Sequence, residues 1–247
     1  DESGADLAAA IGALPGIEVE GLFTHFSRAD EMEKTSAMTQ LGRYLHFTEL
    51  LKARGLEIPI KHCSNSAGII DLPQANLNCV RAGITMYGMY PSEEVQKDKV
   101  PLKPALGLKS FVTYVKELGP GEEISYGGTY VTERTMRIAT VAVGYGDGYP
   151  RSLSNCGYVL ICGKRARILG RVCMDQLMVD VTDIMEADVD TPVTLIGKDG
   201  DEEITMEHLA ELCGGFHYEM VCDIGKRVPR VYYRGGKVVG TMDCFAE

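Results

Sequence analysis

The sequence predicts an α/β region followed by a domain built mostly of antiparallel β-strands. Helix-like and strand-like segments alternate over residues 1–100, and strand-like segments separated by Gly, Pro, Asp and Asn turns fill residues 101–247. Alternating strands and helices imply parallel pairing through right-handed crossovers, whereas short strands between turns are typical of an antiparallel sheet. The pattern changes in the stretch KDKVPLKP, so we place the domain boundary near residue 100.

The α/β region is predicted from apolar periodicity and from its Gly and Pro stops. Two helices are expected at 5–14 and 31–53, closed by Pro15-Gly16 and Gly55, and a short third helix begins near Asn65-Ser66. Strands are expected at 19–26, 58–64 and 78–86.

The second region is predicted as a β-domain interrupted by one helix. Its strands are expected at 110–118, 136–143, 158–162, 166–172, 177–181 and 193–196. The helix is expected at 206–213, with Thr205 as N-cap and Gly214 past its end. The stretch EISYGGTY places Tyr126 on a Ser/Gly turn between two strand-like runs, where the ring either packs on the sheet or is held out for another active site.

Composition limits the class of protein. The 247 residues are 45% apolar and 24% charged, enough for one large or two medium globular domains. A net charge of −10 and a pI near 5.1 argue against nucleic-acid or anionic-membrane partners. No apolar run reaches the length of a membrane span and no leader opens the chain, so we expect a cytoplasmic protein. The eight cysteines form no C-x-x-C pair and the five histidines lack ligand spacing, so we expect no metal site.

Three polar clusters follow strands of the α/β region. They are Thr24-His25, the run from His62 to Ser66, and the run from Arg81 to Ile84. Parallel folds place active sites at these strand ends. Ser66 and the backbone near Gly83 suit a phosphate, although an Asn-Ser pair before a helix is more often only an N-cap. Arg81 in an apolar segment requires an acceptor, either His62 or a ligand.

Five segments together resemble bacterial alanine racemase. They are HCSNSAG at 62–68, CVRAGITMYG at 79–88, ISYGGTY at 124–130, GYGDGYPR at 144–151 and GRVCMDQ at 170–176, in the family's order and spacing. The resemblance covers essentially the whole chain and corresponds to the C-terminal two-thirds of such an enzyme. It implies a pyridoxal 5'-phosphate-dependent isomerase of fold type III. Residues 1–100 would be the C-terminal part of a (β/α)8 TIM-like barrel with the phosphate and ring contacts, and residues 101–247 a β-domain with dimerisation and the catalytic tyrosine.

The resemblance also implies roles for individual residues. The phosphate contacts match Ser66, Gly83, Ile84 and Tyr218, and the residue facing the pyridine nitrogen matches Arg81, with His62 behind it. Tyr126 matches the tyrosine that acts in the partner subunit's active site, supported by His25 and Arg81. Met174 matches the residue whose backbone holds the substrate carboxylate. The substrate corridor matches Asp30, Tyr145, Arg151 and Arg171.

The activity that the resemblance implies is the interconversion of L- and D-alanine, which supplies D-alanine for peptidoglycan, by a homodimer with shared active sites. Racemisation removes a proton on one face of Cα and delivers one on the other, so it requires two acid/base groups. Two alternatives stay open: a serine racemase of the same fold, and a non-catalytic β-domain or dimerisation fragment. Tyr126 and Met174 favour alanine.

One departure from the family concerns its covalent lysine. The chain begins Asp1-Glu2-Ser3, and the lysine-bearing segment of the A-V-V-K-A-D-A-Y-G-H-G type does not occur in it, nor do about the first five barrel strands. Lys34, Lys52 and Lys61 do not match that lysine. We therefore expect a fragment or processed chain that is inactive alone and folds fully with an N-terminal fragment of the same enzyme.

Overall fold

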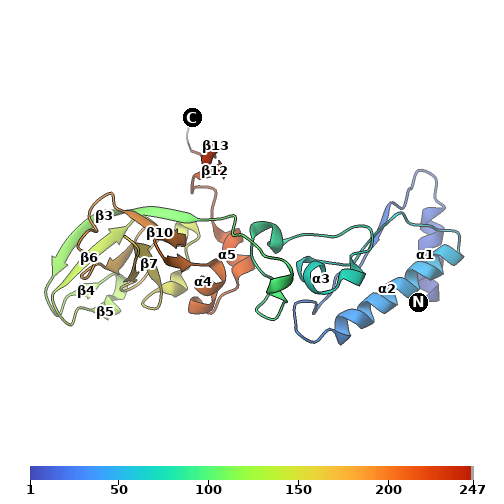
Figure 1. The fold of residues 1–247 in the computed structure, drawn as a ribbon, viewed down its shortest axis with the longest axis horizontal. Helices are drawn as coiled ribbons and strands as arrows, with labels where there is room; N and C mark the ends of the chain where they lie inside the picture. The colour runs from blue at the N-terminus through green and yellow to red at the C-terminus, as the bar shows by residue number, and fades with distance from the viewer. Residues whose placement is uncertain (246–247) are drawn as a thin grey trace. The chain divides into compact units, whose positions relative to one another are not determined.

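The computed structural model describes residues 1–245 and divides into two compact units, Asp1–Ala105 and Leu106–Glu247 (Figure 1). The first unit is α/β and the second is mostly β. The division falls five residues after the predicted boundary. Within the described residues, no helix is long and apolar enough to cross a membrane.

The first unit contains one pair of parallel strands with helices around it. Its elements are α1 (Glu2–Gly12), β1 (Gly21–Phe23), α2 (Thr35–Ala53), β2 (Ile60–His62), α3 (Ser66–Asp71) and the 3-10 helices η1 (Pro73–Ala75), η2 (Ile84–Tyr87) and η3 (Lys97–Lys99). Gly21 pairs with Ile60, and Phe23 pairs with His62. The predicted strand–helix–strand crossover through α2 is confirmed.

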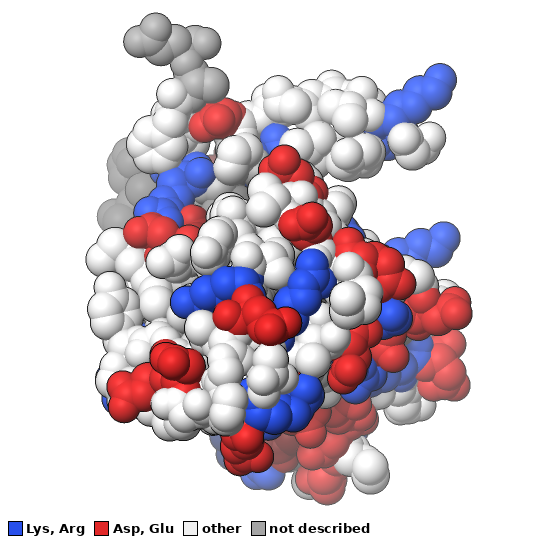
Figure 2. All heavy atoms as spheres, turned by 90° about the vertical axis from the view of Figure 1, so that its left-hand side faces the viewer, with Lys and Arg blue, Asp and Glu red and all other residues white. Residues whose placement is uncertain are grey.

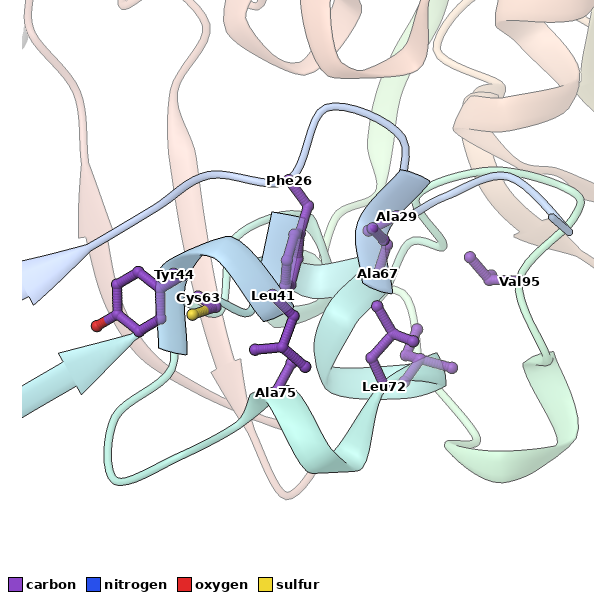
Figure 3. Packing of buried hydrophobic residues seen from close by; sticks show 11 residues of the cluster. Phe26, Ala29, Leu41, Tyr44, Cys63, Ala67, Leu72, Ala75 and Val95 are labelled. Atoms are coloured by element: carbon purple, nitrogen blue, oxygen red, sulfur yellow. The ribbon is translucent and has the colours of Figure 1, made fainter. Parts of the chain in front are cut away.

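A single apolar cluster joins α2 and α3 to the loops that follow the strands. Figure 3 shows it around Phe26, Leu41, Tyr44 and Leu72, with small alanines between the larger side chains. The Tyr44 hydroxyl donates to the Leu22 carbonyl at 2.7 Å, and burial raises the pKa of Tyr44 to about 12. The cluster therefore fixes α2 against the strand from which a candidate site loop begins.

The third strand predicted at 78–86 is wrong. The Arg81 N–H donates to the Ser64 carbonyl at 3.0 Å, as it would in a ladder between two strands. The Lys61 N–H, however, donates to the side-chain oxygen of Asn78 and not to a backbone carbonyl of this segment. A strand requires a repeated ladder of backbone bonds, and one bond does not form it. The chain then winds into η2, which ends at Gly88 with φ +78. Short apolar runs do not distinguish these conformations.

The second unit is an antiparallel sheet with strand order β8-β7-β10-β3-β6-β9, with β11 added on β10. Its strands are β3 (Leu108–Leu118), β4 (Glu123–Ile124), β5 (Tyr130–Val131), β6 (Met136–Val141), β7 (Tyr158–Ile161), β8 (Lys164–Arg167), β9 (Leu177–Asp180), β10 (Pro192–Asp199), β11 (Glu202–Ile204), β12 (Arg230–Arg234) and β13 (Lys237–Met242). Its helices are α4 (Met206–Cys213), α5 (His217–Asp223), η4 (Tyr126–Gly128), η5 (Tyr145–Asp147) and η6 (Arg151–Leu153).

The sheet closes on itself. Ile168, directly after β8, bridges to Val179 of β9, so the two ends of the strand order meet. The side chains inside are fully buried, among them Leu160, Leu177 and Leu195. The strand predicted at 166–172 ends earlier, at Arg167, because the chain turns at Gly170 with φ +74. The helix predicted at 206–213 is confirmed, including the cap from Thr205.

The β12–β13 hairpin forms a sheet of its own, and Figure 1 shows it projecting from the chain that follows α5. Its apolar side chains are exposed, including Tyr233 and Val239. On the face in Figure 2, Lys and Arg side chains alternate with Asp and Glu, so no extended surface of one charge sign forms there.

Candidate functional site

The predicted site residues of the first unit gather at the carboxyl ends of β1 and β2. The strands are parallel and in register, so Thr24 and His25 after β1 lie beside His62 at the end of β2. The Thr24 N–H donates to the His62 carbonyl at 3.3 Å, which extends the ladder beyond β1. The fold therefore brings two of the predicted clusters to one edge.

Arg81 joins both histidines. Its Nη1 lies 2.5 Å from His62 Nδ1 and its Nη2 lies 3.2 Å from His25 Nδ1. The Nη2 atom also donates to the carbonyls of Thr24 and Cys63 at 3.0 and 3.2 Å. The acceptor that Arg81 required is thus supplied by His62 and by strand-end carbonyls.

These contacts fix the tautomers of the histidines. A guanidinium carries only donors and keeps its proton, so each Nδ1 facing Arg81 must accept. Partial burial and then the positive charge of Arg81 lower the pKa of His62. His62 is therefore held neutral, with its proton on Nε2.

The Nε atom of Arg81 makes no hydrogen bond to any of residues 1–245, although both terminal nitrogens do. The Phe23 ring, 5.4 Å from the guanidinium carbon, stacks on His62. One rigid, permanently charged donor is consequently left for an acceptor atom of a ligand.

Ser66 and the loop that begins at Gly83 form a second group of donors. The buried Ser66 Oγ accepts from the N–H groups of Gly83 and Thr85 at 3.0 and 3.4 Å and lies 3.1 Å from Thr85 Oγ1. Asn65 is the N-cap of α3, because its side chain accepts from the Gly68 N–H. Ser66 is therefore free of the capping role, and two hydroxyls and two amides converge in a set that suits a phosphate. Ile84 beside them is buried.

The loop that carries Asp30 is held by a hydrogen bond and by an ion pair. The Asp30 carbonyl accepts from Ser92 Oγ at 2.5 Å. Lys34 Nζ lies 2.7 Å from Asp71 Oδ2, and the side chain of Asp71 is fully buried. The two groups attract as charges, since they are not aligned for a hydrogen bond.

Tyr126 stands on the turn between β4 and β5. Ile124 pairs with Tyr130 across this hairpin, and Tyr126 opens η4 between them. Its side chain is 72% exposed, and its hydroxyl makes no hydrogen bond within the part of the chain that the structure describes. The phenol therefore points away from the sheet instead of packing on it.

The GRVCMDQ loop supports this turn. Ser125 Oγ donates to the Arg171 carbonyl at 2.6 Å. A Cβ on Gly127 would lie 3.1 Å from Arg171 Nη1, so the guanidinium rests against this glycine. Tyr126 and Arg171 are thus neighbours through their loops.

Met174 and Tyr145 are brought together by strand register. Val141 at the end of β6 pairs with Leu177 at the start of β9, so the loop after β6 and the loop before β9 leave the sheet at one end. The Tyr145 N–H donates to the Cys173 carbonyl at 3.0 Å and the Gly146 N–H to the Met174 carbonyl at 2.8 Å. The N–H of Met174 makes no hydrogen bond within residues 1–245, and its side chain is 53% exposed.

Arg227, which the sequence interpretation missed, ties these loops to the end of α5. Its Nε donates to Asp147 at 2.7 Å and its Nη2 pairs with Asp175. These carboxylates raise the pKa of Arg227, through the hydrogen bond to Asp147 first. The acidic residues in GDG and MDQ indicate that a cation is needed, but the sequence does not say which one.

The remaining predicted residues lie in the second unit. Arg151 is exposed at the start of η6. Tyr218 lies in α5 and stacks on Phe216, with ring centroids 4.8 Å apart. The structure therefore groups the Arg81, His25, His62 and Ser66 side chains in one unit, and Tyr126, Tyr145, Arg171 and Met174 in the other.

Comparison with known proteins matches both units to a two-domain class of enzyme. The family model "Alanine racemase, C-terminal domain" matches residues 105–232, and "Alanine racemase, N-terminal domain" matches residues 1–91. The chain belongs to the alanine racemase family.

Curated relatives and solved structures agree with this assignment. The alanine racemase of Clostridium perfringens (strain SM101) is 46% identical over 239 residues, which are 97% of this chain and 62% of that protein. The alanine racemase of Methanococcus maripaludis is also 46% identical, over 94% of this chain and 62% of that protein. The structure of Clostridium difficile 630 alanine racemase in complex with cycloserine superposes with a TM-score of 0.94 at 40% identity, over all of this chain and 64% of that one. The chain therefore spans less than two-thirds of the relatives it matches.

Proposed function

We propose that this protein interconverts L- and D-alanine with pyridoxal 5'-phosphate as its cofactor, in a fold type III enzyme whose barrel includes β1 and β2. The observation that carries the proposal is Arg81, which is locked by two histidines and keeps one donor, Nε, for a ligand. Arg81 is half-buried, and its terminal nitrogens contact five acceptors: the Nδ1 atoms of His62 and His25 and the carbonyls of Thr24, His62 and Cys63. Core packing alone does not require an arginine held in this way. Family membership names the chemistry that such a donor would serve.

The residues present fit that cofactor. The Ser66 hydroxyl and the amides of Gly83, Ile84 and Thr85, together with Tyr218, would hold its phosphate, and Arg81 Nε would face its ring nitrogen. When bound, pyridoxal phosphate withdraws electron density from the amino acid and makes the Cα proton removable.

Arg81 limits how far that withdrawal proceeds. A guanidinium donates a hydrogen bond but does not transfer its proton at any working pH. The ring nitrogen it faces would therefore stay unprotonated, and the negative charge on the substrate would be less stabilised than where a carboxylate keeps that nitrogen protonated. This favours immediate return of a proton over side reactions such as transamination.

Tyr126 and Met174 would act on the substrate. The Met174 N–H, which has no acceptor within residues 1–245, would donate to the substrate carboxylate. Tyr126 Oη would take or return the proton on one face of Cα. Because the phenol is exposed on an ordered turn, we propose that it serves the active site of a partner subunit in a homodimer. Asp30, Tyr145, Arg151 and Arg171 would line the corridor to this site.

The second acid/base group would be the family's covalent lysine, which Lys34, Lys52 and Lys61 do not match. Lys34 forms an ion pair with Asp71, and Lys61 Nζ donates to the Ile58 carbonyl. Lys52 is exposed on α2. We therefore propose that residues 1–247 do not racemise alanine without a further segment of the enzyme.

The test begins with the intact mass of the purified material under denaturing conditions, together with the visible absorbance of lysine-bound cofactor. Racemisation of L-alanine and of L-serine is then followed by chiral chromatography, for the complete polypeptide and for its Tyr126→Phe variant. By complete polypeptide we mean residues 1–247 together with the family's lysine-bearing segment. Alanine turnover that Tyr126→Phe abolishes supports the proposal. Faster turnover of serine would make the enzyme a serine racemase, and racemisation by residues 1–247 alone would contradict our account of the lysine. If the complete polypeptide is colourless and inactive, the proposed function is wrong and the alternative of a non-catalytic module is supported.

A further inference from the structure

The backbone immediately before Tyr126 is strained. Ser125 has φ +66 and ψ −179. A side chain at Cβ crowds the backbone in this region, which is populated almost entirely by glycine, and residues held there cluster at functional sites. Two glycines follow directly, Gly127 with φ +74 and Gly128 with φ +52. The turn thus uses glycine where it needs unusual torsions, except at Ser125.

The hydroxyl explains why this position carries a serine. Ser125 Oγ donates to the Arg171 carbonyl at 2.6 Å and lies 3.4 Å from Cys173 Sγ. Glycine would relieve the strain but could not make this bond. The side chain therefore joins the turn to the loop that also carries Met174.

The opposing loop is shaped to receive Ser125. Gly170 has φ +74, and a Cβ there would lie 2.8 Å from the Ser125 Cβ and would collide with the Ile124 carbonyl. The backbone therefore approaches Ile124 and Ser125 closely at Gly170, and the next residue, Arg171, supplies the carbonyl that accepts from Ser125 Oγ. The two ends of the turn are fixed as well, because Glu123 pairs with Val131 and Ile124 with Tyr130.

We propose that Ser125 is a positioning residue: its hydroxyl holds an unfavourable backbone conformation against the Arg171 carbonyl and so fixes the direction in which Tyr126 projects. The inference rests on the proposed role of Tyr126 as a proton-transfer group. Without the bond, the strain at Ser125 would turn the peptide toward a common conformation and would displace the phenol that follows it. A displacement of about 1 Å from reacting atoms lowers a rate by roughly 100-fold.

The test compares Ser125→Ala with Ser125→Gly in the complete polypeptide saturated with pyridoxal phosphate. Alanine keeps the strain and loses the anchor, whereas glycine loses both. We expect kcat to fall by roughly 10- to 100-fold for Ser125→Ala and by less for Ser125→Gly. The matched control is Ser110→Ala, which removes a hydroxyl donating to the Ala142 carbonyl at 2.9 Å in β3; its kcat should stay within about 2-fold of the parent.

A second kinetic measurement separates positioning from general loosening. Tyr126 would remove the substrate proton in only one direction of racemisation. In Ser125→Ala, the α-deuterium isotope effect should therefore rise in that direction and stay unchanged in the other. An equal rise in both directions would overturn the proposal, as would a Ser125→Ala enzyme with the kcat of the Ser110→Ala control.

A third measurement does not depend on the reaction. With 3-fluorotyrosine placed at position 126 alone, Ser125→Ala should broaden or split the ¹⁹F resonance, and Ser110→Ala should not. This comparison decides the role of Ser125 even if the complete polypeptide racemises neither alanine nor serine. An unchanged resonance in Ser125→Ala would overturn the positioning role and would leave the proposed function standing.

Discussion

The ion pair of Lys34 with Asp71 offers a direct test of how the site loop of the first unit is held. Lys34→Met keeps the length of the side chain and removes its charge, which leaves the fully buried Asp71 carboxylate without a counter-ion. Breaking a buried pair from one side destabilises a protein by about 3–5 kcal/mol. Asp71 Oδ1 still accepts from the Gln96 N–H, and Lys34 is 20% exposed, so water can reach the site. We therefore expect a loss of about 2–3 kcal/mol in the free energy of unfolding.

The assay is urea unfolding of the complete polypeptide followed by circular dichroism. The expected result is a lower midpoint with an unchanged m-value. Adding Asp71→Asn to Lys34→Met should recover about 1–2 kcal/mol, because the neutral amide no longer needs a counter-ion. Lys97→Met is the control, since its exposed pair with Glu93 at 2.7 Å contributes at most about 0.5 kcal/mol. If Lys34→Met matches this control, the pair does not hold the loop and our reasoning is refuted.

Three further outcomes are expected. The lowered pKa of His62 means that the unfolded state binds protons more readily, so stability should be retained above pH ~6.5 and should fall as the pH drops further. In His62→Gln the amide oxygen can still accept from Arg81, but the side chain does not titrate. Urea titrations at pH 5–7 should therefore show a smaller loss of unfolding free energy for this variant than for the parent. Gly148→Ala should destabilise by more than about 3 kcal/mol, against about 1 kcal/mol for Gly163→Ala. Both glycines have positive φ, but a Cβ on Gly148 would lie 2.0 Å from the Asp223 carbonyl oxygen, whereas one on Gly163 would lie 3.8 Å from the Asp199 carbonyl oxygen. Equal thermal shifts would contradict this. Arg227→Met should raise the KM for alanine while kcat changes little, because the ion pairs of Arg227 with Asp147 and Asp175 hold the loop that carries Met174. An unchanged KM would show that these ion pairs do not position Met174.

Local signals predicted the elements that depend only on local chemistry. The helix at 206–213 was predicted with its Thr205 cap because the cap and the glycine stop lie in the sequence itself. The third strand failed for the opposite reason, since a strand is defined by a partner that the sequence does not name. The 230–242 hairpin was missed, although Gly235 and Gly236 at its tip were a turn signal.

In the candidate site, too, features set by neighbouring residues were predictable and contacts between distant parts of the chain were not. An arginine in an apolar segment predicts that an acceptor lies nearby, and His62 supplies it. The anchors of the loops were not predictable, because Ser125 bonds 46 residues along the chain and Arg227 bonds 80 residues back to Asp147. Neither contact leaves a local pattern, and the family resemblance concerns the residues that face the ligand more than those that hold them.

The closed sheet of the second unit also sets the order in which it can assemble. β10 lies between β7 and β3 in the sheet, yet Val193 of β10 pairs with Ser110 of β3, more than eighty positions earlier in the chain. Such a long loop must be closed before its contacts stabilise anything, which slows folding. Until β10 is inserted, the edges of β3 and β7 are open to strands of other molecules. Synthesis at low temperature and low concentration should therefore raise the yield of folded protein, because it gives the last strand time to reach its place.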